Sequence, residues 1–141
     1  MTYSETYSAF WNHLKTFADL PVSRVQVTNE PVDGDGAFQV PDSGVWARMT
    51  VAYGQTFVAG LADNPVTRRV GVLSFQLFGE RGCGEYPLLD LAESLTQHFQ
   101  FHRYAFLEIL TGSTANISAS NGKWHQVNVN FTFRVYTNGA Q

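Results

Sequence analysis

The feature that most constrains the fold is a run of strict alternation near the C-terminal end of the chain. From Trp124 to Tyr136 an apolar set of side chains alternates with a polar set: Val127, Val129, Phe131, Phe133 and Val135 against Asn128, Asn130, Thr132 and Arg134. This period of two predicts a strand with one buried face and one face that meets solvent or a partner. Asn121-Gly122, just before it, is a strong hairpin signal, so residues 116–120 are predicted to form the paired strand.

Two segments instead repeat apolar residues at the spacing of an amphipathic helix. The first segment is expected to have Ser4 as its N-cap and to end at Leu20-Pro21. Its apolar face consists of Tyr7, Phe10, Trp11, Leu14, Phe17 and Ala18. The second segment has Pro87 in its first turn, a position that accepts proline. Its apolar face consists of Leu88, Leu91, Ala92, Leu95 and Phe99.

Two further segments, Val45–Tyr53 and Arg69–Phe78, alternate as strands, and 104–109 is predicted as a short strand. Long loops are expected over 28–44 and 54–67. The resulting order of helix, strand, strand, helix and strands predicts an α+β fold. We expect a largely antiparallel (mixed) sheet with two helices packed on one face, in a single compact domain over 1–141 with long loops.

Composition narrows the class of function. Only 15% of the 141 residues are charged, against about 25% in average proteins, while 14% are aromatic. Such a surface is more often covered by a partner than left in water. The net charge of −3 excludes a generally basic nucleic-acid binder. Residues 1–44 carry six acids against two bases, and 45–141 carry six acids against seven bases, an asymmetry that suits head-to-tail self-association.

Reactive groups are scattered. His98 and His102 share one helix face, but they sit where the helix should end, which favours surface histidines over a metal site. Cys83, the only cysteine, excludes an internal disulfide and is interpreted as a small loop residue rather than a nucleophile. Asp33-Gly34-Asp35 lacks the later ligands of a calcium loop. We therefore expect no catalytic residue, metal or cofactor, and no enzyme. No signal peptide or membrane span is expected either.

Five residues are predicted to lie at an interface. Arg68 and Arg69 form the densest basic spot, at the end of a long loop, where they suit an acidic partner or passing DNA. Trp46 shares a predicted strand face with polar residues, as an interface anchor would. Asp33 and Asp35 belong to an acidic loop that a rigid sheet would project. Charge reversal at Arg68 and Arg69 is expected to weaken assembly without unfolding the protein.

The order of these elements resembles the tail terminator, or tail completion, proteins of tailed bacteriophages, the group of the minor tail protein U. The likeness covers nearly the whole chain. It is based mainly on the first helix (10–14), two strands (45–51 and 69–78), the glycine loop with the helix that follows it (82–95) and the end of the last strand (131–134). Cys83 falls in the Gly82-Cys83-Gly84-Glu85 loop, at a position that varies in this group.

The resemblance implies a structural role in the virion and no catalytic residues. Such proteins form a hexameric ring on the last ring of tail-tube subunits, stop tube polymerisation and give the head or neck protein a docking surface. DNA passes through the lumen, and no membrane is involved. The chain would reside at the neck-proximal end of the tail, and in the host cytoplasm during assembly.

Two alternatives stay open. One is another head–tail connector or head-closure protein, which is also a small ring former. The other is a small enzyme or ligand-binding α+β domain, which would need titratable groups that converge in a pocket.

Overall fold

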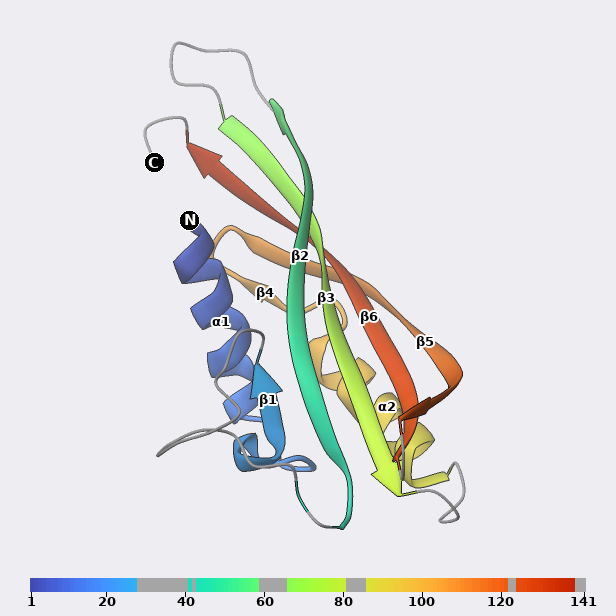
Figure 1. The fold of residues 1–141 in the computed structure, drawn as a ribbon. Helices are drawn as coiled ribbons and strands as arrows, with labels where there is room; N and C mark the ends of the chain where they lie inside the picture. Colours follow the sequence, from blue (N-terminus) through green and yellow to red (C-terminus); the bar gives the residue numbers. More distant parts are fainter. Residues whose placement is uncertain (28–40, 42, 59–65, 81–85, 122–123, 139–141) are drawn as a thin grey trace, which may run out of the picture.

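The computed structural model describes residues 1–27, 41, 43–58, 66–80, 86–121 and 124–138. Two α-helices, one short 3-10 helix (η1) and six strands follow one another along the chain (Figure 1): α1 (Tyr3–Lys15), η1 (Val22–Arg24), β1 (Val25–Val27), β2 (Trp46–Val58), β3 (Val66–Glu80), α2 (Tyr86–Phe99), β4 (Arg103–Tyr104), β5 (Leu107–Asn121) and β6 (Trp124–Asn138).

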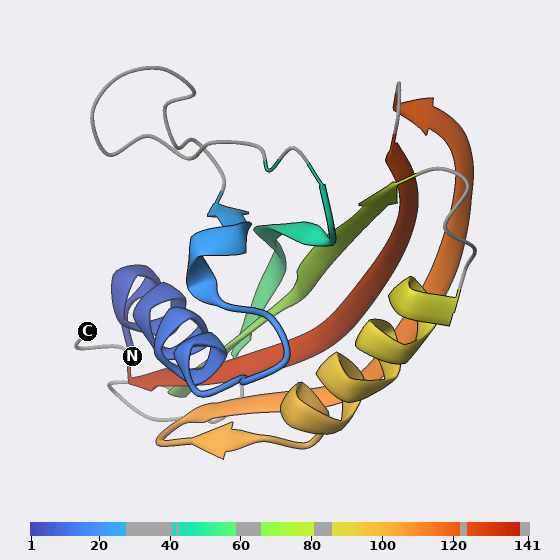
Figure 2. The ribbon, with the colours of Figure 1, turned by 90° about the horizontal axis from the view of Figure 1, so that it is seen from below.

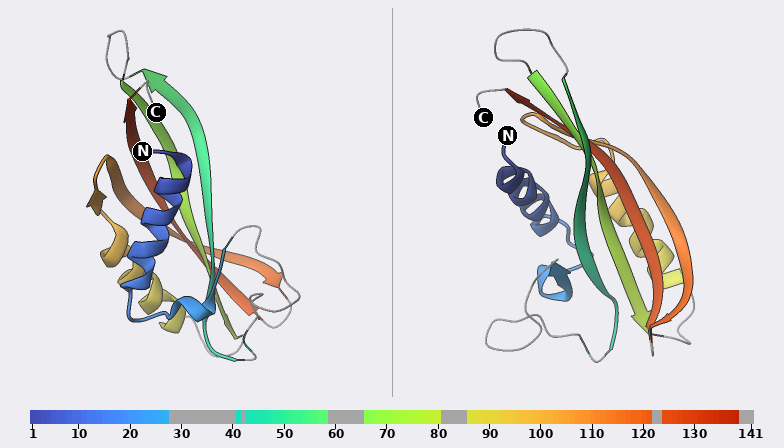
Figure 3. Two further views of the ribbon diagram at one scale, coloured as in Figure 1. Left: turned by 90° about the vertical axis from the view of Figure 1, so that its left-hand side faces the viewer. Right: turned by 45° about the horizontal axis from the view of Figure 1, so that its top comes forward.

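The strands form one curled sheet in the order β1-β2-β3-β6-β5-β4. Only β1 and β2 run parallel, and every other pair is antiparallel. Both helices lie on the same side of this sheet (Figures 2 and 3). The predicted fold class is therefore confirmed: a single compact α+β domain with a mixed sheet and two helices on one face.

The long strands extend beyond their predicted limits. Residues 54–58 belong to β2 and 66–67 to β3, so the loop expected over 54–67 was too long. The predicted short strand 104–109 and the strand 116–120 are largely one strand, β5. Register shifts between Tyr53 and Thr56 and between Ile109 and Gly112 interrupt the alternation, which hid this continuity. Of the loop expected over 28–44, residues 28–40 and 42 lie outside the described residues.

The start of α1 differs from the prediction. Thr2, not Ser4, is the N-cap, and its hydroxyl oxygen accepts a hydrogen bond from the Glu5 backbone N–H at 3.1 Å. Thr2-x-x-Glu5 has the residue types of a capping box, a sequence signal that was available and missed. The helix ends at Lys15 rather than near Leu20, although Phe17 and Leu20 continue into the core outside helical geometry.

The core fills the space between the helices and the inner face of the sheet, which we define as the face that the helices cover. Phe10 and Leu14 enter it from α1, and five apolar residues enter it from α2. The ring of Phe10 packs edge-on against Phe133 of β6, with 4.9 Å between centroids. These contacts leave the opposite, outer face of the sheet without a helix. Within the described residues, no helix is long and apolar enough to cross a membrane.

Candidate functional site

The outer face of the sheet presents a band of polar side chains across the central strands. Arg48 of β2 donates hydrogen bonds to the Gln26 side-chain oxygen at 3.0 Å and to that of Gln76 at 3.2 Å. Further along, the Ser74 hydroxyl donates to the Asn130 side-chain oxygen at 2.7 Å. This is the polar half of the alternation seen in the sequence. The band is neutral apart from Arg48, and its side chains already bond to one another, so it offers no reactive group.

Trp46 lies on this outer face, as the alternation predicted, but it offers almost no surface. Only 4% of it is exposed, because its ring stacks on Phe78 at 4.3 Å and meets Trp124 edge-on at 6.0 Å. Arg48 adds a cation–π contact, with its guanidinium carbon 5.8 Å from the Trp46 ring. The expectation of an exposed interface anchor is therefore corrected. Trp46 belongs to a small aromatic cluster on the outer face.

Arg68 and Arg69 point to opposite faces because neighbouring residues of a strand alternate. The Arg68 guanidinium carbon lies 5.8 Å from the Phe57 ring on the outer face. Its Nε atom is buried, with no hydrogen-bond partner among the described residues. Arg69 instead faces inward and binds the start of the chain. It donates to the Met1 carbonyl at 3.3 Å and covers the Tyr3 ring at 3.9 Å.

Beside Arg68, the outer face holds an open groove of about 650 Å³. Its walls are apolar in the middle and basic at the edges, and they include Ala52, Arg68, Val70, Val72 and Arg134. The Nε of Arg134 donates to Glu108 at 2.7 Å, and Arg103 also pairs with Glu108. Chiefly through the bond from Arg134, the pKa of the Glu108 carboxyl lies below its usual range. The groove and its edge carry three arginines against one glutamate.

Asp33 and Asp35, the other two predicted interface residues, lie outside the described residues. So do Cys83 and the Gly82–Glu85 loop. The interface positions predicted for Asp33 and Asp35 therefore stay predictions.

The histidines gather more closely than the sequence indicated. His13 of α1 stacks on His98 at 4.1 Å and on His102 at 3.6 Å between ring centroids. Across this seam the Nε2 of His13 donates to the His98 carbonyl at 2.7 Å, and the Nε2 of His98 donates to the His13 carbonyl at 2.9 Å. Because the rings are stacked, their nitrogen atoms do not converge on a common point as the ligands of a metal ion do. In the described part of the chain no group of three or more His, Cys, Asp or Glu residues is arranged to hold a metal ion.

We expect this histidine stack to make the stability of the protein depend on pH. Partial burial, together with the neighbouring imidazoles, lowers the pKa of His13 below the ordinary 6.5, and burial followed by His98 lowers that of His102. Below about pH 6.5 the unfolded chain then binds more protons than the folded one, so the free energy of unfolding falls as the pH falls. We expect a loss of less than about 1.4 kcal/mol per group, because each is partly solvated.

Urea unfolding at about pH 7 and about pH 5.5 measures this dependence. The variant His102→Gln should reduce this dependence of stability on pH. Equal stability of the unmodified protein at both pH values would contradict the prediction.

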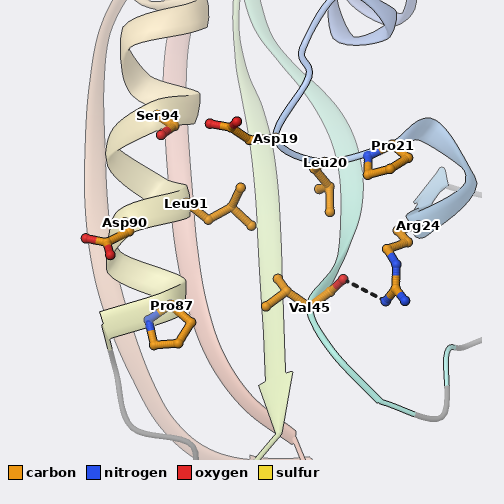
Figure 4. A pocket seen from close by; sticks show the side chains of 9 residues that line it. All are labelled: Asp19, Leu20, Pro21, Arg24, Val45, Pro87, Asp90, Leu91 and Ser94. Carbon is orange, nitrogen blue, oxygen red and sulfur yellow. Dashed lines mark hydrogen bonds between the residues drawn. The ribbon is translucent and has the colours of Figure 1, made fainter.

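A second open pocket, of about 460 Å³, lies between α2 and the segment that leads into β1 (Figure 4). Leu20, Val45 and Leu91 point toward one another and form its apolar floor. Asp19 and Asp90 stand at its rim, and neither forms an ion pair with another described residue. Arg24, on the opposite side, is engaged with the backbone and donates to the Ser43 carbonyl at 3.1 Å and the Val45 carbonyl at 3.2 Å. We call this the α2 pocket.

These features define an α+β domain with an uncovered sheet face and two open, oppositely charged hollows. A solved protein named only by a sequence identifier superimposes on the chain with a TM-score of 0.69, over 96% of each chain, at 19% sequence identity. A likeness at this identity shows the fold alone. No protein-family model matches the chain. No curated protein matches it either.

Proposed function

We propose that the chain is a tail terminator of a tailed bacteriophage, a structural subunit that forms a hexameric ring on the end of the tail tube. The ring stops tube polymerisation and presents a docking surface to a head or neck protein. The protein has no catalytic role. This proposal rests on the sequence resemblance, and the structure contributes one observation that favours it.

That observation is the placement of exposed apolar side chains in several separate patches, of which three lie away from the start of α1, where Tyr3 contacts Tyr53. Phe57, Val58 and Val66 lie at the far end of β2 and β3. Tyr104 lies in β4, with Phe101 and Phe106 on either side of that strand, and Tyr86 and Leu89 lie on the first turns of α2. Aromatic patches of this kind are typical of protein interfaces. A single binding partner needs one such patch. A ring subunit on a tube needs a lateral contact on each side and an axial contact, so separate patches suit it.

The strand end at Phe57 suits the axial contact. Strands β2 and β3 run past both helices at the end of the sheet where α1 begins and β6 ends (Figure 1). A hairpin end projected by a rigid sheet can reach a neighbouring ring without a change in the domain. Arg68 lies directly beside Phe57 and adds a cation for an acidic partner.

The test is to image the purified protein alone and after mixing with its tail-tube protein, and to determine its mass in solution. Six-fold rings, or tubes of uniform length with a cap, are the expected result. Copurification with the portal instead of the tube would transfer the chain to the connector class. A monomer that never contacts tubes would overturn the proposal.

The two neighbouring arginines give a matched pair of variants for this assay. Arg68→Glu is expected to reduce capped tubes by roughly tenfold or more while leaving the unfolding midpoint almost unchanged, because Arg68 faces the proposed axial contact and not the core. Arg69→Glu removes the hydrogen bond to Met1 and the contact with Tyr3. It should therefore lower stability by about 1 kcal/mol.

Urea unfolding and tube imaging of both variants check this difference. The earlier expectation treated both residues as interface residues. Normal capping by Arg68→Glu would show that this end of the sheet is not the docking surface.

A further inference from the structure

A turn on the opposite end of α2 from the α2 pocket carries chemistry that complements that pocket. Phe101, Tyr104 and Phe106 are each 58–64% exposed, and Arg103 stands among them with 73% of its side chain exposed. We call these four residues the turn patch. Arg103 pairs with Glu108, but a guanidinium has five N–H donors, so most of them remain available to a partner.

The backbone of the turn patch is held in an unusual conformation. Phe101 and Ala105 have φ values of 63° and 51°, in the left-handed region that non-glycine residues rarely adopt. The Phe101 N–H nevertheless donates to the Leu110 carbonyl at 3.3 Å, and the Tyr136 N–H donates to the Phe106 carbonyl at 3.1 Å. The aromatic side chains are therefore presented from an anchored backbone rather than from a loose loop.

The α2 pocket has the matching features. It has an apolar floor of Leu20, Val45 and Leu91, and its rim bears Asp19 and Asp90 without ion-pair partners among the described residues. The Asp90 carboxylate is turned outward from this floor (Figure 4). Among the described residues that line it, the one cation is Arg24, which is engaged with two backbone carbonyls. Its preferred occupant is therefore an apolar or aromatic group accompanied by a positive charge.

We propose that the turn patch of one copy of this chain occupies the α2 pocket of the next copy. The pocket lies beside the N-terminal half of α2 and the turn patch follows its C-terminal end, so one chain cannot pair the two surfaces within itself. Two different surfaces that pair between copies form a heterologous contact, and repeated contacts of this kind close into a ring or extend as a filament. This inference rests on the proposed function for its ring, and it identifies the lateral contact.

The experiment uses two surface variants of the full chain and a mass measurement in solution. The turn variant carries Arg103→Glu and Phe106→Ser, and the pocket variant carries Asp19→Lys and Asp90→Lys. All four positions are exposed, so the variants should fold, and circular dichroism checks that they do. The controls are Lys15→Glu and Glu93→Lys, which each reverse one charge, in opposite directions, at exposed positions outside both surfaces.

We expect the unmodified protein and both controls to form oligomers as concentration rises. Each variant alone should dissociate at least about tenfold more readily. The decisive sample is the equimolar mixture of the two variants. One intact pocket and one intact turn patch remain between them, and the two altered surfaces carry opposite charges. The mixture should therefore regain association, as heterodimers or as larger oligomers that contain both variants.

Variants that oligomerise as the unmodified protein does, or a mixture that does not regain association, would overturn the inference. An unmodified protein that stays monomeric at every soluble concentration would overturn it as well. Tube imaging separates this failure from failure of the proposed function. If the unmodified protein and the variants all cap tubes, only the proposed lateral contact is wrong. If the unmodified protein neither oligomerises nor caps tubes, both the lateral contact and the proposed function are wrong.

Discussion

Replacing Gly71 with alanine is expected to lower the free energy of unfolding by about 3 kcal/mol, one of the two largest effects of a single substitution that we predict. A Cβ atom on Gly71 would lie 2.4 Å from the Ala52 carbonyl oxygen and 2.7 Å from the Phe133 ring. The carbonyl belongs to the backbone of the adjacent strand β2, so it cannot rotate away as a flexible side chain would. The strands β2 and β3 would have to separate.

Gly54→Ala is the matched control, since Gly54 also lies in a long strand. A Cβ atom there would meet Val70 at 3.6 Å, an ordinary van der Waals contact. We expect a change of no more than about 0.5 kcal/mol. Urea unfolding of both variants measures the difference. Equal midpoints would mean that β2 and β3 do not approach each other as closely as the structure has them.

Gly71 also shows where sequence analysis reaches its limit. The alternation from Trp124 to Tyr136 predicted the buried face of β6 correctly, because that strand pairs on both sides and every second residue enters one core. β5 was divided in the prediction, since residues 110–115 break the alternation at a register shift. The three residues of β1 were missed because so short a strand carries no pattern of its own.

The candidate surfaces were predicted less well for a related reason. Alternation alone places Arg68 and Arg69 on opposite faces, yet their adjacency favoured a shared role. Burial of Trp46 depends on Phe78 and Trp124, which come from β3 and β6, and no local pattern brings those strands together. In the same way, His13 joins His98 and His102 only because two helices far apart in sequence pack side by side.

The α2 pocket and the turn patch are also products of tertiary structure. Asp19 and Asp90 are 71 positions apart in the chain, and they share a rim only because the segment before η1 folds against α2. The uneven charge along the sequence nevertheless indicated a tendency to associate head to tail. The acidic first third and slightly basic remainder favoured head-to-tail association. Asp19 and Arg103 fall on the expected sides of that division, whereas Asp90 lies in the basic part.

Phe10→Ala is the second substitution with a large expected effect, a loss of about 3–5 kcal/mol in the free energy of unfolding. Phe10 is completely buried, and its ring packs edge-on against Phe133. Truncation removes this contact and leaves a cavity between α1 and the sheet. Besides its core side chains, α1 is held by the His13–His98 hydrogen bonds and by the bond from Arg69 to Met1.

Because Phe10 is one of only two buried apolar residues within α1 as the structure describes it, α1 should respond first. Hydrogen exchange of Phe10→Ala should show faster exchange of the α1 amides than of the β3 and β6 amides, which lie in the centre of the sheet. Phe10→Leu is the control, since it keeps most of the buried volume and should cost less than about 1.5 kcal/mol. A uniform rise in exchange across α1 and the central strands would instead show that α1 unfolds only with the whole domain, as one cooperative unit.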